Sequence, residues 1–195
     1  MSNPAQLRFL WIPKNGGTSI EQTLTAAVRP AVWQLQSVWR FDGFKVLNHG
    51  HCAGLGLPRS VLPFGVCRDP YSRAVSLYHA SHLGHVAQGV TDFTSFCRRL
   101  ADGLQWRVTP YRFNLLRPQI DYVDDRCRVL RFESLADDWR EFSAGHGLPE
   151  NLQHQKQTQA TKQRDWRSYY TDETRAQVAR FYAADFERFG YPVGS

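Results

Sequence analysis

Short apolar runs alternate with amphipathic segments along the chain, and this alternation is typical of an α/β domain. Four apolar runs are candidate strands: residues 7–12, 44–47, 64–67 and 128–132. The third run begins at Val61, but Pro63 lacks the backbone N–H that a strand ladder needs. We therefore expect the strand itself to start after this proline.

Apolar residues at helical spacing follow the first and third of these runs. The first helix is expected to begin at Thr18 or Ser19, whose hydroxyls suit a helix cap, and to stop at Pro30. The second is expected to begin at Pro70, because proline fits the first turn of a helix, and to continue towards Leu83.

Three further helices complete the pattern. One is capped by Thr91 or Asp92, one begins at Ser134 with Asp137 in a capping-box-like arrangement, and one runs from about Thr171 to Gly190. Residues 149–168 are polar and irregular, so a surface loop is expected there. The sequence thus predicts one α/β domain over residues 1–195, with a central parallel sheet flanked by helices.

The composition is that of an ordinary globular protein, with 42% hydrophobic and 22% charged residues. No apolar run reaches the roughly 18 residues of a membrane-spanning helix, and the N-terminus has no signal-peptide pattern. The formal net charge is +6, and only four of the 24 cationic residues are lysines. Because arginine grips phosphate, sulfate or carboxylate in a bidentate manner and no basic tail is present, the charge favours an anionic ligand over nucleic acid.

The four cysteines are Cys52, Cys67, Cys97 and Cys127, which form no CxxC pair and have no regular spacing. The sequence therefore indicates neither a zinc site nor a dithiol redox motif. Cys67 and Cys97 lie in apolar contexts and are expected to be buried free thiols. Free thiols are typical of a reducing compartment, so the sequence predicts a cytoplasmic protein.

The strongest chemical signal is the segment that joins the first strand to the first helix, residues 13–19 (PKNGGTS). Its glycines permit positive φ and let backbone N–H groups approach an anion, at a helix N-terminus whose dipole favours negative charge. Lys14 and the hydroxyls of Thr18 and Ser19 add further donors. The lysine precedes the glycines, so the core is P-loop-like without the Walker order. A tight turn that merely needs glycine is the alternative.

A second segment, residues 68–78 (RDPYSRAVSLY), follows the third strand. That strand would deliver Arg68 to the carboxyl edge of the sheet, where open α/β sheets bind their ligands. Ser76 lies about two helical turns further on, so Arg68 and Ser76 could share one phosphate. Arg73 is a weaker candidate, because it could equally pair with Asp69 or face solvent.

Together the two segments resemble the nucleotide-binding signatures of sulfotransferases that use 3′-phosphoadenosine-5′-phosphosulfate (PAPS). PKNGGTS is similar to the 5′-phosphosulfate loop of that family, and RDPYSRAVSLY is similar to its 3′-phosphate segment. RPQIDYV, VLRFESL and YYTDETRAQVARFYAADFERFGY follow in the order of the carbohydrate-type members, so the resemblance covers residues 7–191. It implies sulfuryl transfer from PAPS to a hydroxyl of a carbohydrate or another small polar acceptor.

The resemblance also implies residue roles. Lys14 would stabilise charge on the bridging oxygen as the sulfuryl group leaves adenosine 3′,5′-bisphosphate, and no metal is required. The 5′-phosphate would be held by Asn15, Gly16, Gly17, Thr18 and Ser19, and the 3′-phosphate by Arg68 and Ser76. Lys162 and Arg164 are candidates for a later basic loop on the nucleotide, or are solvated charges. Trp166 would stack on adenine or pack against the last helix.

The acceptor hydroxyl needs a base that takes its proton. His49 and His51 follow the second candidate strand, and histidine titrates near neutral pH. The resemblance favours His51, with His49 second; a weak metal site or plain loop polarity is the alternative for this pair. Glu133 is the rival base, although it is rather expected to cap the next helix or to pair with an arginine. The resemblance alone places Gln119 and Tyr122 on the acceptor side.

Two other functions stay open: a nucleotide-dependent phosphotransferase, and a non-catalytic module that binds a nucleotide or a sulfated glycan. The position of Lys14 and the lack of a clear Walker-B strand argue against the first. The expected partners are a nucleotide donor and a hydroxyl-bearing acceptor, with no nucleic acid and no membrane span. A chain of 195 residues carries little beyond a nucleotide-binding core, so a homo-oligomer that completes the acceptor site is left open.

Overall fold

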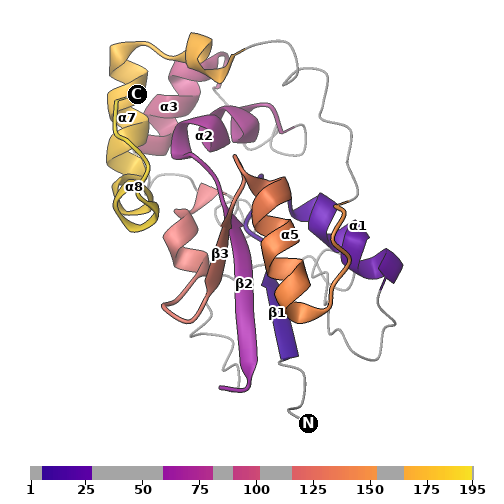
Figure 1. Cartoon of the computed structure of the whole chain (residues 1–195). Coiled ribbons are helices and arrows are strands. Elements are labelled where there is room, and N and C mark those ends of the chain that lie inside the picture. The colour runs from indigo at the N-terminus through magenta and orange to yellow at the C-terminus, as the bar shows by residue number, and fades with distance from the viewer. Residues whose placement is uncertain (1–5, 28–58, 81–89, 102–115, 153–164, 195) are drawn as a thin grey trace. The chain divides into compact units, whose positions relative to one another are not determined.

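The structure is a computed structural model, and it describes residues 6–27, 59–80, 90–101, 116–152 and 165–194. The chain divides into two compact units, and Figure 1 labels their α-helices and strands. The first unit comprises Met1–Cys67 and Asp121–Gln155, and the second comprises Arg68–Ile120 and Lys156–Ser195. Each unit therefore contains segments that are far apart in the sequence.

A parallel sheet forms the centre of the first unit. Among the described residues it has three strands in the order β1 (Gln6–Leu10), β2 (Val61–Cys67) and β3 (Arg128–Arg131). Gly65 of β2 is level with Leu10 on one side and with Val129 on the other. Because all three strands run in the same direction, the segments that follow them start at one edge of the sheet. The predicted α/β class with a parallel sheet is confirmed.

Helices α1 (Gly17–Ala27) and α5 (Leu135–His146) contribute to one hydrophobic core with the sheet. Alternation along β2 places Phe64 and Val66 on the same face, because every second residue of a strand points the same way. The buried members of this core are Ile20, Leu24, Phe64, Val66, Leu130, Trp139, Phe142 and Leu148. Each large apolar side chain buried in this way contributes about 1.5–3 kcal/mol.

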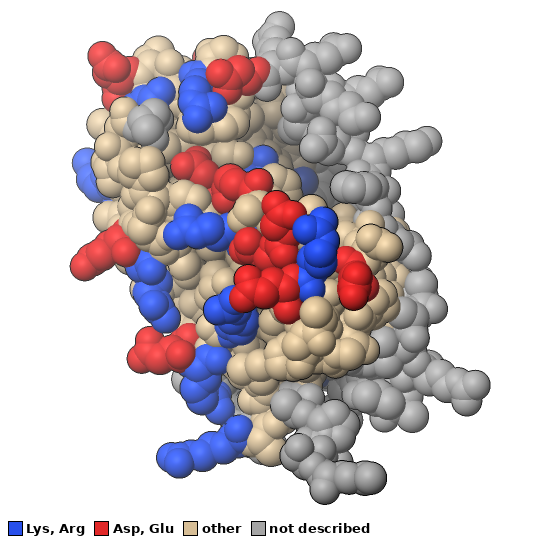
Figure 2. Space-filling model, in the orientation of Figure 1, with Lys and Arg blue, Asp and Glu red and all other residues tan. Residues whose placement is uncertain are grey.

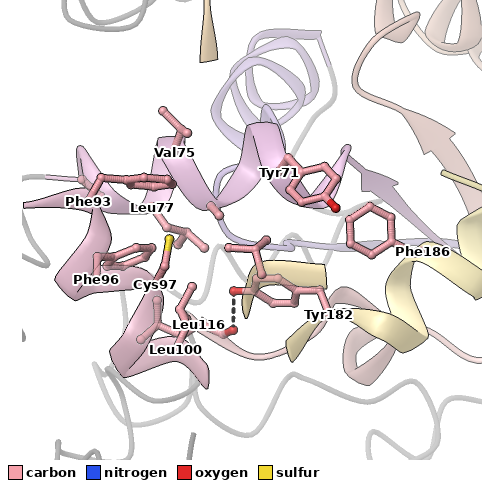
Figure 3. Close-up of a cluster of buried hydrophobic side chains, with 13 residues drawn as sticks. Tyr71, Val75, Leu77, Phe93, Phe96, Cys97, Leu100, Leu116, Tyr182 and Phe186 are labelled. Carbon is pink, nitrogen blue, oxygen red and sulfur yellow. Dashed lines mark hydrogen bonds between the residues drawn. The ribbon is translucent and has the colours of Figure 1, made fainter. Parts of the chain in front are cut away.

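The second unit is helical in its described residues. Its elements are α2 (Pro70–Tyr78), α3 (Phe93–Ala101), η5 (Trp166–Tyr169), α7 (Asp172–Phe181) and α8 (Ala183–Phe189), and the short η4 (Gln119–Tyr122) begins in it. Figure 3 shows its core, in which side chains of α2 and α3 meet Tyr182 and Phe186. Burial there raises the pKa of the Cys97 thiol to about 12, as expected of a buried free cysteine.

Two predicted boundaries were wrong, those of β2 and α2. β2 includes Pro63, which is level with Arg8 of β1; pairing with β3 starts only at Phe64, so the proline removes no hydrogen bond on that side. Helix α2 ends at Tyr78 and does not continue towards Leu83. The predicted strand at 44–47 lies outside the described residues.

The last predicted helix is two helices that meet at Tyr182. This residue leaves the helical path, and its buried hydroxyl donates to the carbonyl of Leu116 at 2.8 Å (Figure 3). The start of α5 also differs from expectation: the Ser134 hydroxyl donates to the Asp138 carboxylate and does not cap the helix. Thr171 does form a capping box, with Thr174.

Acidic and basic side chains are intermixed on the face that carries α5 (Figure 2). Arg140 pairs with Asp137 at 2.9 Å, and Arg128 pairs with Glu141 at 3.6 Å. Both pairs are exposed, so each contributes at most about 1 kcal/mol. Within the described ranges, no helix is long and apolar enough to cross a bilayer.

Candidate anion-binding site

The loop after β1 has an unusual backbone. Lys14 has a φ of 69° and Gly16 a φ of 77°, so both lie in the left-handed region. This conformation is ordinary for glycine, but for Lys14, which has a Cβ, it costs about 1 kcal/mol or more. Left-handed residues in tight turns direct neighbouring N–H groups to one side and so form a concavity that suits an anion. The loop geometry therefore fits the predicted phosphate-binding role.

A buried side-chain hydrogen bond fixes this loop to the sheet. The Nδ2 group of Asn15 donates to the carbonyl of Val66 at 2.6 Å, and Asn15 is only 1% exposed. Gly16 rests on Phe132 and Leu135, because a Cβ built on it would lie 3.2 Å and 3.1 Å from their side chains. The loop is thus held beside the ends of β2 and β3. Asn15, predicted to bind the nucleotide, uses its side-chain amide to anchor the loop.

The two glycines are required for different reasons. Gly16 needs its positive φ, whereas Gly17 needs the space next to Trp11. A Cβ on Gly17 would lie 2.7 Å from two atoms of the Trp11 ring, closer than real Cβ contacts. Packing of the first turn of α1 on Trp11 therefore explains this glycine, for which an approaching anion or a tight turn was expected.

The N-terminus of α1 provides a favourable field for an anion. Its first turn contains no acidic residue, and Thr18 is exposed there with Ser19 half-buried. The dipole of the helix adds partial positive charge at this end, next to the half-buried Lys14. Lys14, Thr18 and Ser19 thus lie in one segment of the first unit, as the sequence predicted.

In the second unit, Arg68 stands directly before α2. Asp69 caps this helix by accepting the N–H of Ser72 at 2.8 Å, and Pro70 occupies its first turn. The Nε of Arg68 donates to the hydroxyl of Ser72 at 2.9 Å. The cap and this bond together orient the guanidinium group along the first turn of α2.

Ser72 and Ser76 lie four residues apart on α2 and share one helix face. They are 7% and 8% exposed. With Arg68 four residues earlier, the three side chains follow one line along the helix. Arg68 and Ser76 were predicted from the sequence but Ser72 was not, although its spacing of four residues from each of them was a usable signal.

Gln119 holds the backbone of Arg68 on both sides. Its Oε1 accepts the Arg68 N–H at 2.9 Å, and its Nε2 donates to the Arg68 carbonyl at 2.8 Å. Gln119 is 0% exposed. Both ends of its amide therefore bond to the main chain of Arg68. The expected place of Gln119 on the acceptor side stays a prediction.

Arg73 is not a solvent-facing residue. It is 0% exposed, its Nη1 donates to the carbonyl of Arg117 at 3.0 Å, and its guanidinium lies 5.4 Å from the centre of the Tyr182 ring. A buried guanidinium with such partners stabilises the second unit. Trp166 likewise packs within this unit, stacked on Tyr71 with ring centres 6.2 Å apart, which supports its packing role.

Glu133 is exposed and follows β3 at the edge from which the residue 13–19 loop also departs. Its neighbours Phe132 and Leu135 are the residues on which Gly16 rests. Four other predicted site residues, His49, His51, Lys162 and Arg164, lie outside the described residues. Their roles stay predictions.

The parallel sheet packed against helices α1 and α5 defines an α/β protein. The model of the sulfotransferase family matches residues 1–192, and the chain belongs to this family. Comparisons with curated proteins and with solved structures find no significant match. The resemblance found in the sequence is thus confirmed at the level of the family.

The packing of Gly17 on Trp11 leads to a prediction. Gly17→Ala should lower the free energy of unfolding by at least about 1 kcal/mol, because the new methyl group has no space. Replacing Trp11 by Leu in the same chain should reduce this cost. Gly145→Ala is the matched control: nothing lies within 4 Å of its Cβ position, and alanine in α5 should stabilise the protein. Denaturant unfolding of these three variants and of Trp11→Leu alone, each beside the wild-type chain, measures this; equal effects at the two glycines would contradict the packing.

Proposed function

We propose that this sulfotransferase uses PAPS as its donor and transfers the sulfuryl group to a hydroxyl of a carbohydrate or another small polar molecule. Two observations support the proposal, one within each unit. Lys14 and Gly16 provide the left-handed loop, and Arg68 with Ser72 and Ser76 provides the arginine-serine helix face. A nucleotide with phosphates at both its 5′ and 3′ positions presents two anionic groups that suit two such segments.

The 5′ end of the donor is assigned to the loop after β1. Backbone N–H groups around Gly16 and Gly17 and the hydroxyls of Thr18 and Ser19 donate to the phosphate. When the acceptor oxygen bonds to sulfur, the bond from sulfur to the bridging oxygen breaks, and that oxygen gains negative charge. The ammonium of Lys14 neutralises this charge as it develops.

The 3′ phosphate is assigned to Arg68 and Ser76. A guanidinium has five N–H donors, of which Nε binds Ser72, and its planar fork matches phosphate oxygens. Lys162 and Arg164 are proposed to add donors from a later segment of the chain.

His51 is proposed as the base that takes the acceptor proton, with His49 second. Glu133 is the rival, and its exposed position at the carboxyl edge of the sheet is a specific observation in its favour. Either group has to lie within hydrogen-bond reach of the acceptor hydroxyl.

The match of one family model to residues 1–192 supports the view that both units belong to one catalytic domain. The buried free thiols of Cys67, Cys97 and Cys127 support a reducing compartment, for which we propose the cytoplasm.

Two substitutions of Lys14 separate its charge from its backbone. Lys14→Ala and Lys14→Gly should each reduce the transfer rate by about 100-fold or more, because both remove the ammonium group. Lys14→Gly should nevertheless be more stable than Lys14→Ala by about 1 kcal/mol, or about 2–4 °C in melting temperature, because only glycine fits a φ of 69° without strain. The measurements are single-turnover transfer and thermal unfolding.

Arg140→Ala is the charge-matched control for these variants, since Arg140 is an exposed residue of α5 paired with Asp137. It should leave the rate of transfer unchanged. Transfer by Lys14→Ala at nearly the wild-type rate would show that the proposed role of the lysine is wrong.

The identity of the donor is tested by calorimetry without added metal. Adenosine 3′,5′-bisphosphate should bind at least about tenfold more tightly than ATP, because ATP has no 3′-phosphate for Arg68 and Ser76. A clear preference for ATP would reject PAPS as the donor and favour a phosphotransferase.

The base is tested by His51→Ala beside Glu133→Gln. His51→Ala should abolish turnover and leave the affinity for adenosine 3′,5′-bisphosphate intact, because the base contacts the acceptor and not the nucleotide. His49→Ala and Glu133→Gln should keep most of the turnover. Loss of turnover in Glu133→Gln alone would make Glu133 the base, and loss of nucleotide affinity in His51→Ala would indicate a structural role.

A further inference from the structure

The main chain at Arg68 is fixed by a residue 51 positions later in the sequence. The amide of Gln119 pairs with both the N–H and the carbonyl of Arg68, at 2.9 Å and 2.8 Å. A neighbouring β-strand would bond to the N–H and the carbonyl of one residue in the same way, but here a single side chain makes both hydrogen bonds. They hold the main chain of Arg68 just before the cap of α2 while leaving the guanidinium group outside the pair.

Gln119 is in turn held by a buried carboxylate. The oxygens of Asp185, in α8, accept the N–H groups of Gln119 and Ile120 at 2.8 Å each. Asp185 is 0% exposed, and burial raises the pKa of its carboxyl group, while the charge of Arg73 and the bonds from Gln119 and Ile120 oppose this rise. A buried carboxylate is costly unless such partners compensate for its lost hydration.

We propose that Gln119 and Asp185 are positioning residues that give the protein its selectivity for nucleotides carrying a 3′-phosphate. This inference rests on the proposed function, in which Arg68 contacts that phosphate. Arginine has a long side chain and loses considerable rotamer entropy when it is held in one place. With its main chain fixed by Gln119 and its Nε held by Ser72, Arg68 loses less freedom on binding the phosphate.

A role limited to stability predicts a different result from a role in positioning. If Gln119 serves stability alone, its loss would either weaken the binding of every adenine nucleotide equally, through partial unfolding, or leave the binding of all of them unchanged. Loss of the bonds to Arg68 would weaken only the nucleotides whose 3′-phosphate Arg68 contacts. The informative quantity is therefore the ratio of two affinities measured on the same folded protein.

The experiment compares adenosine 3′,5′-bisphosphate with adenosine 5′-phosphate by calorimetry. The wild-type chain should prefer the bisphosphate. Gln119→Met keeps most of the buried volume but removes both bonds to Arg68, and it should reduce this preference by about tenfold with the affinity for the monophosphate unchanged. Asp185→Asn keeps one acceptor oxygen for the two N–H groups and should reduce the preference by a smaller factor, about threefold.

Tyr170→Phe is the matched control. It removes the hydrogen bond from the Tyr170 hydroxyl to the carbonyl of Tyr71, a contact in the same unit that does not involve Arg68. It should destabilise the protein and leave the ratio unchanged. Thermal unfolding of each variant shows whether the affinities were measured on folded protein. If Gln119→Met does not fold, Asp185→Asn, which is the milder change, tests the same role.

Arg68→Ala tests whether Gln119 acts through Arg68. It should remove most of the preference for the bisphosphate, and adding Gln119→Met to it should have no further effect on the ratio. An unchanged ratio in folded Gln119→Met, or in folded Asp185→Asn, would overturn the positioning role. A wild-type chain without preference for the bisphosphate, or an Arg68→Ala variant that keeps it, would instead overturn the proposed 3′-phosphate contact itself.

Discussion

The hydrogen bond from Asn15 to the carbonyl of Val66 is the interaction on which the geometry of the loop after β1 depends. It is buried, and it joins the loop after β1 to the carboxyl end of the neighbouring strand. With the loop anchored there, Lys14 can occupy the left-handed region, although this costs about 1 kcal/mol or more. A backbone strain of this kind persists only where the surroundings impose it, and Asn15 with the packing of Gly16 on Phe132 and Leu135 does so.

Much of the fold could be predicted from local patterns. The strands at β1, β2 and β3 are short apolar runs, and the start of α2 follows from Pro70. Helix α1 begins at Gly17, one residue before the predicted start at Thr18 or Ser19. The segment 13–19 was recognisable as a candidate anion-binding loop because strand, glycines, lysine and hydroxyls stand together in a few residues. The errors are at boundaries decided by distant partners: Pro63 fits within β2 because β3 begins opposite Phe64, and Tyr182 divides the last helix where its hydroxyl binds Leu116.

The supporting residues of the site could not be predicted, because nothing near them in the sequence indicates their task. Gln119 is 51 positions from Arg68, and Asp185 is 66 positions from Gln119, so only the folded chain shows the link. The reason for Gly17 could not be predicted either, because the sequence does not distinguish a glycine that packs on Trp11 from a glycine that makes room for a phosphate. Ser72 is the exception, because its spacing from Arg68 and Ser76 is local and was available.

The dependence of Arg68 on α8 has a consequence for how the protein is made. Arg68 leaves the ribosome long before Asp185, which belongs to the last helix described. Its helix α2 can start early, since the cap by Asp69 is local. The two bonds that hold Gln119 and Ile120 can form only after α8 has been synthesised, because both are made to Asp185. Gln119, which fixes the main chain of Arg68, is therefore fully held only when nearly the whole chain has been made.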